Sequence, residues 1–534
     1  TANGLIDTAQ LLNLLPESLT RGIDGSSQWK LNLAIANVPQ TGGNPSLTIN
    51  ASSNLQGTAI NFPAPYSKES AQNRQLAGRV VLRGNGDILF NADYSSDIKI
   101  RGQVDKSSGA DYQLADLDLA FSSPLKTEQV SGIRLYGKLQ DLPLDEWITL
   151  HQTEKTRQDP DSRSLMPLLQ LIDMQVAEIR LFGRSVNEVD FQMRQSENGF
   201  NGNIQSQEAA GMFFYPWQDS VQNPVVLDMN YLRLASRPGP ESFNSWVPDD
   251  FFNARFRSKV FAYDGKEVTD LEIDTSRDGE FLLIDRLAFL HNKIRFEAYG
   301  YWLYSAVTKK HDSFFAININ GSEFGQTIAS LGFGDTIGNG KIKFTGQVEW
   351  PASMMDPDWD IVRGKGDLKL EDGILKDIEP GSGRFVGLFS LSALPRRLAL
   401  DFSDVLFDGL EFDEIKGNLE LNGPDLYTNN LKLEGAAVEV KLVGTTDLRD
   451  REYDQKIYVT PNIRHALPVI GSIAAGSSVG WALLLLQNLL KSPIDESLEI
   501  EYSVTGSWDD PVIKTISKPK QEVYETRGGI NIEK

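Results

Sequence analysis

The alternation of polar and apolar residues constrains the fold of this chain more than any other feature. Residues 341–350 read K-I-K-F-T-G-Q-V-E-W, in which every second residue is apolar or glycine. The same pattern recurs at residues 117–119, 227–231, 271–273, 419–421, 431–433, 438–442 and 498–504. Because successive side chains of a strand point to opposite faces, each such strand has one apolar and one polar face. Antiparallel sheets with one covered face have this pattern, whereas parallel sheets buried on both faces do not.

Helices are few and short in comparison. The sequence predicts them at residues 6–19, 144–151, 165–174, 323–331 and 384–391. They are too few to cover about thirty strands, which at about 4.8 Å spacing would form a sheet on the order of 140 Å long. Compact sheets rarely exceed about ten strands without curling or splitting. We therefore expect an all-β fold, an elongated and twisted antiparallel β-sheet folded into a trough or groove.

One internal repeat is readable in the chain. A glycine followed by apolar residues at fixed spacing occurs at residues 183–191 and again at 265–273, with a shorter form at 409–415. The glycine predicts a turn, and the apolar residues predict entry into the next strand. Repeats that contact only their neighbours form extended bodies. The alternative is that these are unrelated hairpins.

Composition excludes several classes of function. The net charge is −21, whereas nucleic-acid binding proteins carry a basic surface. The same acidity disfavours electrostatic docking on anionic lipid, so any membrane contact must be hydrophobic. The chain contains no cysteine, which excludes disulfides, thiolate nucleophiles and cysteine-ligated metals.

No motif in the chain carries a convincing catalytic signal. Residues 476–480 match G-x-S-x-G, but the last histidine, His465, precedes the serine instead of following it. Residues 356–360 imitate the start of a calcium loop but lack its later glycine and glutamate. We therefore expect no enzyme, no metal and no cofactor. A glycosidase or lyase remains an alternative, for which the sequence offers only dispersed carboxylates.

Residues 466–490 form an uncharged segment, ALPVIGSIAAGSSVGWALLLLQNLL, which is interrupted by three glycines. It is long enough to span a bilayer. The alternatives are a buried helical hairpin that caps the β-body, or a short helical pair that dips into one face of a bilayer. We favour the last. The expected contacts with the membrane are Val469, Ile470, Ile473, Val479, Trp481, Leu483, Leu484, Leu485, Leu486, Leu489 and Leu490.

The domain organisation follows from these segments. We expect a β-groove body at residues 1–460, an apolar helical tip at 461–495, and a terminal strand and tail at 496–534. Residues 152–164 and 237–250 are expected to be pauses within the body. No secretory signal is visible at the start of the chain, so we expect any membrane anchor to lie upstream.

Several runs resemble the AsmA-like family of bridge-like lipid transfer proteins, to which TamB is related. The runs are LQGTAINFPAPYSK at residues 55–68, GRFVGLFSLSALPRRLALDF at 383–402, residues 459–490, and VTGSWDDP at 504–511. The resemblance covers residues from near 10 to about 515 and corresponds to the C-terminal part of such a protein. It implies a location in the periplasm of a Gram-negative bacterium, bridging the inner and outer membranes.

The resemblance also implies a function. Phospholipid acyl chains would move as cargo along an apolar groove, the C-terminal tip would contact the inner leaflet of the outer membrane, and a missing N-terminal anchor would hold the inner membrane. No catalytic residues are implied, and the helper proteins are unknown. The alternative is a periplasmic structural or assembly protein that acts on outer-membrane proteins by β-strand addition.

Alternation predicts which side chains line the groove. They are the apolar members of the alternating strands: Leu117, Leu119, Val189, Phe191, Leu227, Met229, Leu271, Ile273, Ile317, Ile319, Ile342, Phe344, Val348, Leu368, Leu370, Leu419, Leu421, Leu431, Leu433, Val438, Val440, Leu442, Ile500, Tyr502 and Val504. A closed sandwich core is the alternative for the same residues.

Overall fold

The computed structural model describes residues 1–7, 22–36, 46–106, 112–155, 166–181, 183–235, 246–330, 337–357, 360–376, 410–436, 438–461, 499–508 and 510–517. Within these ranges, 27 strands belong to one sheet, accompanied by two α-helices and two short 3-10 helices. The chain divides into two compact units. Unit 1 comprises residues 1–240 and 253–267, and unit 2 comprises residues 241–252 and 268–534.

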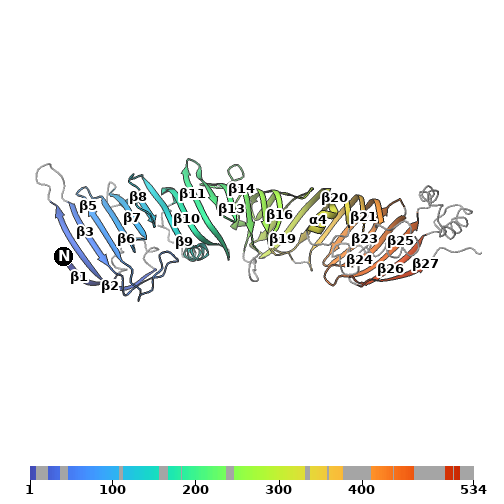
Figure 1. The fold of residues 1–534 in the computed structure, drawn as a ribbon, viewed down its shortest axis with the longest axis horizontal. Helices are drawn as coiled ribbons and strands as arrows, with labels where there is room; N and C mark the ends of the chain where they lie inside the picture. The colour runs from blue at the N-terminus through green and yellow to red at the C-terminus, as the bar shows by residue number, and fades with distance from the viewer. Residues whose placement is uncertain are drawn as a thin grey trace, which may run out of the picture. The chain divides into compact units, whose positions relative to one another are not determined.

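Unit 1 contains the strands coloured blue to green in Figure 1. They pair in chain order, except that β4 pairs with the start of β2, and β3 pairs with β5. The elements are β1 (Ala2–Asp7), β2 (Ile23–Ala36), β3 (Ser46–Ser53), β4 (Thr58–Ile60), β5 (Leu76–Leu82), β6 (Ile88–Tyr94), β7 (Ile98–Lys106), β8 (Tyr112–Phe121), β9 (Gly132–Pro143), α3 (Leu144–Lys155), η1 (Met166–Leu168), β10 (Leu169–Leu181), β11 (Arg184–Ser196), β12 (Gly199–Gln205), β13 (Ala209–Pro216), β14 (Val225–Leu234) and β15 (Ala254–Tyr263).

Unit 2 is a meander of long strands, and each described pairing in it is antiparallel. Its elements are η3 (Pro248–Asp250), β16 (Lys266–Asp278), β17 (Phe281–His291), β18 (Ile294–Ser305), β19 (Lys310–Ser322), α4 (Phe324–Ser330), β20 (Ile337–Trp350), β21 (Arg363–Leu375), β22 (Leu410–Asn422), β23 (Asp425–Glu434), β24 (Val438–Asp447), β25 (Glu452–Pro461), β26 (Ile500–Ser507) and β27 (Val512–Ser517).

The expected all-β fold is confirmed, and most strand pairs are antiparallel as expected, but the sheet is mixed. Three neighbouring pairs are parallel: β8 with β9, β9 with β10, and β14 with β15. Parallel neighbours require a connection that returns along the sheet instead of a tight hairpin. The two segments expected to be pauses, 152–164 and 237–250, fall within two of these three connections. The alternation pattern alone contains no signal for this change of direction.

The connection between β8 and β9, residues 122–131, is held to the sheet by a buried ion pair. Asp118 on β8 accepts hydrogen bonds from Nε and Nη2 of Arg134 on β9, at 2.6 and 2.7 Å. Arg101 on β7 also contacts the Asp118 carboxylate. The hydrogen bond from Arg134 to Asp118 raises the pKa of this guanidinium above its usual range. The Arg134 guanidinium therefore stays charged, although it and Asp118 are both nearly fully buried.

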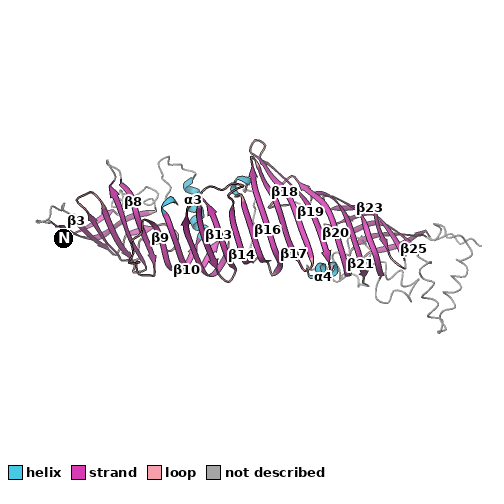
Figure 2. Cartoon of the chain, turned by 90° about the horizontal axis from the view of Figure 1, so that it is seen from above, coloured by secondary structure: helices cyan, strands magenta, loops and turns pink. Residues whose placement is uncertain are grey.

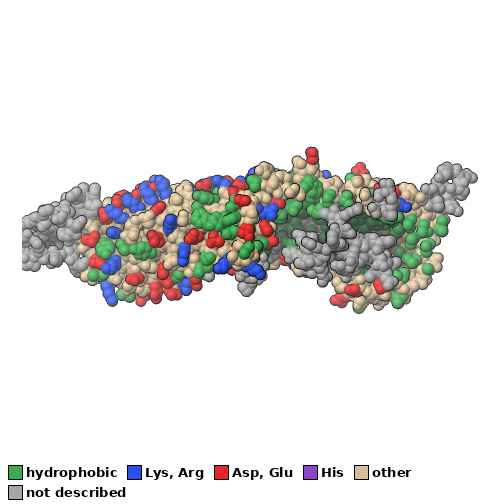
Figure 3. Space-filling model, turned by 180° about the vertical axis from the view of Figure 1, so that it is seen from behind, with side chains coloured by type: hydrophobic (Ala, Val, Ile, Leu, Met, Phe, Trp, Pro, Cys, Tyr) green, Lys and Arg blue, Asp and Glu red, His purple; other side chains and the backbone are tan. Residues whose placement is uncertain are grey.

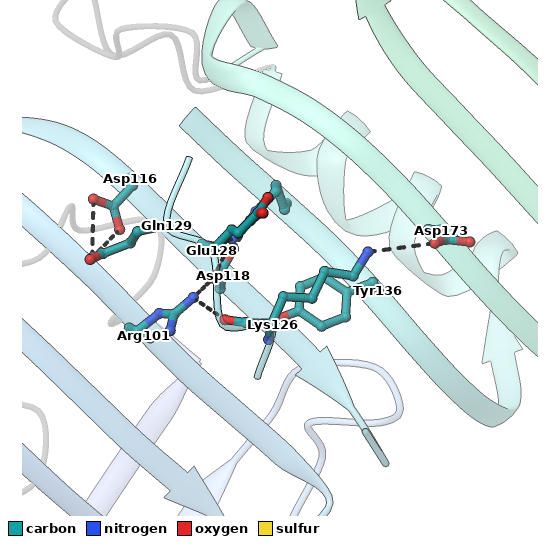
Figure 4. A network of polar contacts seen from close by, with 9 residues as sticks. Arg101, Asp116, Asp118, Lys126, Glu128, Gln129, Tyr136 and Asp173 are labelled. Carbon is teal, nitrogen blue, oxygen red and sulfur yellow. Dashed lines mark hydrogen bonds and ion pairs between the residues drawn. The ribbon is translucent and has the colours of Figure 1, made fainter. Parts of the chain in front are cut away.

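The same two arginines fasten the backbone of the connection, whose residues Lys126 and Glu128 are drawn together with Arg101 in Figure 4. Nη2 of Arg134 donates to the carbonyl of Glu128 at 2.7 Å, and Nη2 of Arg101 donates to the carbonyl of Lys126 at 2.8 Å. The Lys126 amide donates to the Tyr136 hydroxyl at 2.9 Å, and its ammonium lies 4.6 Å from the centre of that ring. These bonds satisfy a loop that would otherwise lie on the sheet with unpaired polar groups.

Helix predictions had mixed outcomes. The helices expected at residues 144–151 and 323–331 are confirmed as α3 and α4. The helix expected at 165–174 is wrong, because this stretch forms η1 and the start of β10. Its short, continuous apolar run has no periodicity that separates a helix from a buried strand. The helix expected at 6–19 begins within β1, and its remainder lies outside the described residues, as does that expected at 384–391.

The repeated motif marks the same local structure in both places. Gly183 and Gly265 have positive φ angles of 66° and 77° and form the expected turns. Five residues later, Glu188 and Asp270 also have positive φ, at 53° and 51°. The pairing register shifts next to Asp270, which is the signature of a β-bulge, whereas it is constant across Glu188. The repeat therefore encodes a turn followed, five residues later, by a residue with positive φ.

Candidate functional site

The register of unit 2 places its apolar side chains on one face of the sheet, called here the inner face. Direct cross-strand partners on one face of adjacent strands form rows across the sheet. The rows in the middle of the inner face contain only apolar residues and glycine, apart from Thr275 at the β16 end of the third row. They are Phe289, Phe296, Ile319, Phe344 and Leu368; then Ile273, Leu287, Ala298, Ile317, Gly346, Gly366 and Leu419; then Ile284, Gly300, Phe315, Val348, Gly364 and Leu421.

These three rows, called the central strip of unit 2, are half-exposed. Of their members only Ile284 and Ala298 are buried, at 5% and 6% exposure. The Phe344 ring lies over glycines: a Cβ atom added at Gly366 would approach the ring tip to 2.6 Å. Because Gly366 has no side chain, the Phe344 ring can lie flat against the sheet, and it does not project from the strip.

On one side of the strip the next row is fully buried. Its members include Ile294, Ile342, Leu370, Ile415 and Leu433, each at 6% exposure or less. They share one hydrophobic cluster with two residues of α4, Phe324 and Ile328. Figure 2 shows α4 beside the ends of β19 and β20 instead of over their middle. The helix therefore covers the margin of the inner face and leaves its centre open.

The other side of the strip has a second covering. Leu282, Trp302 and Trp350 are buried there, and Trp302 has no exposed surface. Residues Trp246, Phe251 and Met354 pack against this cluster or its neighbours, with the Phe251 and Trp302 rings 5.6 Å apart. In an ordinary sandwich the centre of a sheet face is the most buried part. Here, among the described residues, the margins are buried and the apolar centre is only partly buried.

Unit 1 has an equivalent strip, formed by a row that crosses twelve strands. Its members are Ala51, Gly78, Ala92, Ile100, Leu119, Leu135, Ile172, Met193, Gly202, Phe213, Leu227 and Phe256, and all are half-exposed. With Ile49, Val80, Phe90 and Leu117 in the adjacent row, it makes up the central strip of unit 1. Figure 3 shows the hollow lined by hydrophobic side chains in this unit.

One margin of the unit 1 strip is covered by residues 54–75, called the strap, together with α3. The Tyr66 ring of the strap lies 6.2 Å from Phe121 on β8 and 5.8 Å from Trp147 on α3. Trp147 Nε1 donates to the carbonyl of Ala64 at 3.0 Å. Burial under these contacts raises the pKa of Tyr66 to about 12. The strap buries Tyr94, Phe121 and their neighbours and leaves Leu119, two residues away, half-exposed.

The opposite, outer face of unit 2 is charged. Lys369 pairs with Glu371 and Glu414 at 2.7 and 2.9 Å, and Lys432 pairs with Glu434 and Glu439 at 3.0 and 2.9 Å. Figure 3 shows basic and acidic side chains interspersed over this part of the surface. Exposed pairs of this kind contribute little to stability. They make the outer face soluble, so the two faces of the sheet differ sharply in polarity.

The predicted lining residues therefore fall into two groups. Eleven lie on the central strips and are half-exposed: Leu117, Leu119, Leu227, Ile273, Ile317, Ile319, Phe344, Val348, Leu368, Leu419 and Leu421. Phe191 and Ile500 are half-exposed outside the strips. The others are buried: Val189, Met229, Leu271, Ile342, Leu370, Leu431, Leu433, Val438, Val440, Leu442, Tyr502 and Val504. In this conformation the buried group has almost no surface to offer a ligand.

The buried group is concentrated in β23–β26. Leu431, Leu442, Ile457 and Tyr502 are successive cross-strand partners, and none exceeds 5% exposure. The inner face is thus closed along these strands. The predicted membrane contacts at residues 469–490 lie outside the described residues, so their role stays a prediction.

Sequence reasoning missed strip residues on strands with bulges. Phe289 and Phe296 stack with ring centres 4.7 Å apart at one end of the strip. A register shift between Ile284 and Leu287 breaks the alternation of β17, so counting every second residue does not connect Ile284 with Phe289. A run with paired apolar residues, such as residues 281–290, is the signal that a bulge leaves in the sequence.

The described residues contain no group of three or more metal-ligating side chains. Among the helices in the described part of the chain, none is long and apolar enough to cross a membrane.

His311 beside the covered margin of unit 2 should make that margin sensitive to acid. Trp302 Nε1 donates to His311 Nδ1 at 3.0 Å, and burial lowers the pKa of this imidazole from 6.5. The native state therefore holds the neutral form, and its stabilising contribution is complete above pH 6.5. As the pH falls from 6.5 towards the lowered pKa, the unfolded state binds the proton preferentially, and the contribution is lost.

We therefore expect the unfolding temperature of unit 2 to fall between about pH 7 and pH 5, the range in which histidine titrates. In His311→Gln, whose side-chain oxygen still accepts from Trp302, part of this fall should be absent. Scanning calorimetry of both proteins at matched ionic strength measures the difference. Equal pH dependence in the two would show that His311 does not couple protonation to folding.

Comparison with known proteins gives two matches. The family model described as YhdP protein matches residues 1–513. The intermembrane phospholipid transporter YhdP of Escherichia coli (strain K12) is 22% identical over 530 residues. That alignment covers 95% of this chain and 40% of the relative, so the chain spans less than half of the relative's length. No solved structure matches the chain.

Proposed function

Because the chain belongs to the YhdP family, we propose that it conducts phospholipid between membranes by carrying acyl chains on the central strips of its sheet. The similar protein of Escherichia coli is named an intermembrane phospholipid transporter, which supports this substrate class. The physical support comes from the sheet itself. Each strip is apolar and half-exposed while its margin is covered.

The energetic case rests on this open centre. An acyl chain of about fourteen methylenes gains roughly 0.8 kcal/mol for each methylene withdrawn from water, or about 11 kcal/mol in all. The strips in the described residues carry no charged side chain that would hold water against the chain. The headgroup would remain in water, so the barrier to crossing an aqueous space falls by much of the transfer energy.

We place the protein in the periplasm of a Gram-negative bacterium, with an anchor in the inner membrane and residues 469–490 at the outer membrane. The reaction is movement of cargo, with no catalysis and no cofactor.

Lipid analysis of the purified chain tests the proposal. The protein is isolated without detergent and its bound lipid is extracted and identified by mass spectrometry. We expect diacyl phospholipid at one molecule or more per chain. Lipid-free protein that also fails to take up a fluorescent phospholipid from vesicles would exclude it. Retention of an outer-membrane protein in place of lipid would favour the alternative, assembly by strand addition.

A further inference from the structure

The two leucines of β21, Leu368 and Leu370, mark a boundary on the inner face. They are two residues apart on the same strand and therefore point to the same side of the sheet. Leu368 lies on the central strip and is half-exposed, whereas Leu370 is 5% exposed within the cluster that includes α4. The covered margin begins between these two side chains.

The same boundary occurs independently in unit 1. Leu119 and Phe121 are two residues apart on β8 and share a face. Leu119 is half-exposed, whereas Phe121 is 3% exposed beneath Tyr66 of the strap. Different coverings, a helix in one unit and a strap in the other, thus produce the same arrangement. In each unit one row of side chains is covered, and the neighbouring row is half-exposed.

We propose that α4, the strap and α3 act as walls that confine acyl chains to the central strips, so that lipid touches Leu368 and Leu119 but not Leu370 and Phe121. This inference rests on the proposed function and refines it. Of the apolar residues that share the inner face, only those on the strips contact the acyl chains. The covered residues hold the walls in place and take no part in binding.

The strap is the wall whose contacts are simplest to loosen. Tyr66 packs against Phe121 and Trp147, and Trp147 donates to the Ala64 carbonyl. Arg74 Nη1 donates to the carbonyl of Pro65 at 3.1 Å. If the strap is a wall, removing the Trp147 contacts should expose Phe121 to lipid without altering the exposure of Leu119.

A photoreactive diacyl phospholipid with a diazirine in its acyl chain tests the proposal on the unaltered protein. After loading and illumination, the cross-linked residues are mapped by mass spectrometry. We expect Leu368 and Leu119 to carry at least ten times more lipid than Leu370 and Phe121. In Trp147→Ala, cross-linking at Phe121 should rise several-fold while that at Leu119 stays constant. Wild-type hydrogen exchange in β8 and β9 would verify that the variant is folded.

The outcomes separate the inference from the proposed function. Equal cross-linking of both members of each pair would overturn the walls but leave transport along the inner face standing. An unchanged map in folded Trp147→Ala would overturn the role of the strap. Cross-links confined to the outer face, or none at all, would overturn the proposed function and the inference together.

Discussion

Phe344→Asp is expected to lower the rate of lipid passage on the order of a thousandfold while leaving the sheet folded. Phe344 is half-exposed on the central strip, so a carboxylate there stays hydrated instead of being buried. The water bound to this carboxylate would keep about three methylenes of each of the two acyl chains of a lipid away from the strip. At about 0.8 kcal/mol per methylene the added barrier is about 5 kcal/mol, which corresponds to this factor.

Transfer of a fluorescent phospholipid between donor and acceptor vesicles measures the effect. Phe344→Leu, which keeps the position apolar, should transfer lipid at close to the normal rate. Gln347→Asp is the charge control: it lies on the outer face of the same strand, opposite Lys365. Leu421→Asp, on the third row of the strip, should reproduce the block. Normal transfer by Phe344→Asp would contradict conduction along the strip.

Asp118→Ala is expected to destabilise unit 1 by about 3–5 kcal/mol, because it leaves buried guanidinium charge unpaired. Asp118 is 2% exposed and Arg134 is 6% exposed, and the same carboxylate also contacts Arg101. The two arginines fasten residues 122–131 to the sheet, so the loss should be largest in β8 and β9. Hydrogen exchange of these strands, together with urea unfolding, measures it.

Asp141→Ala is the matched control for this prediction. Asp141 pairs with Arg180 at 2.8 Å in the same unit, but the two side chains are 39% and 46% exposed. Removal of an exposed pair should change the free energy of unfolding much less than removal of the buried pair. If both variants lost the same small amount, the buried ion pair would not be what holds the parallel connection in place.

The sequence was sufficient to predict the two faces of the sheet but not the boundary within the inner face. Residues 341–350 alternate without interruption, and the structure places their apolar members on one face. Leu368 and Leu370, however, occupy equivalent places in the pattern D-L-K-L. What distinguishes them is the packing of α4, a contact between segments distant in the chain. Alternation reports which face a side chain is on, not what covers that face.

The parallel strand pairs could not be predicted from the sequence for a related reason. Strand direction depends on where a connection returns the chain, and the ten residues between β8 and β9 resemble any polar loop. Asp118 could have been noticed as a charge flanked by leucines, but its partners Arg101 and Arg134 come from other strands. Only the fold brings these three charges together.

The width of the central strip of unit 2 limits how many lipid molecules can move side by side. Rows on one face are about 7 Å apart along a strand, so three rows span about 14 Å. Hydrocarbon chains in van der Waals contact occupy about 4–5 Å each, so the two tails of one molecule fit abreast but four do not. Lipid molecules would then move along the strip in single file. A single obstacle stops every molecule behind it, which is why one misplaced charge should halt the flow instead of diverting it.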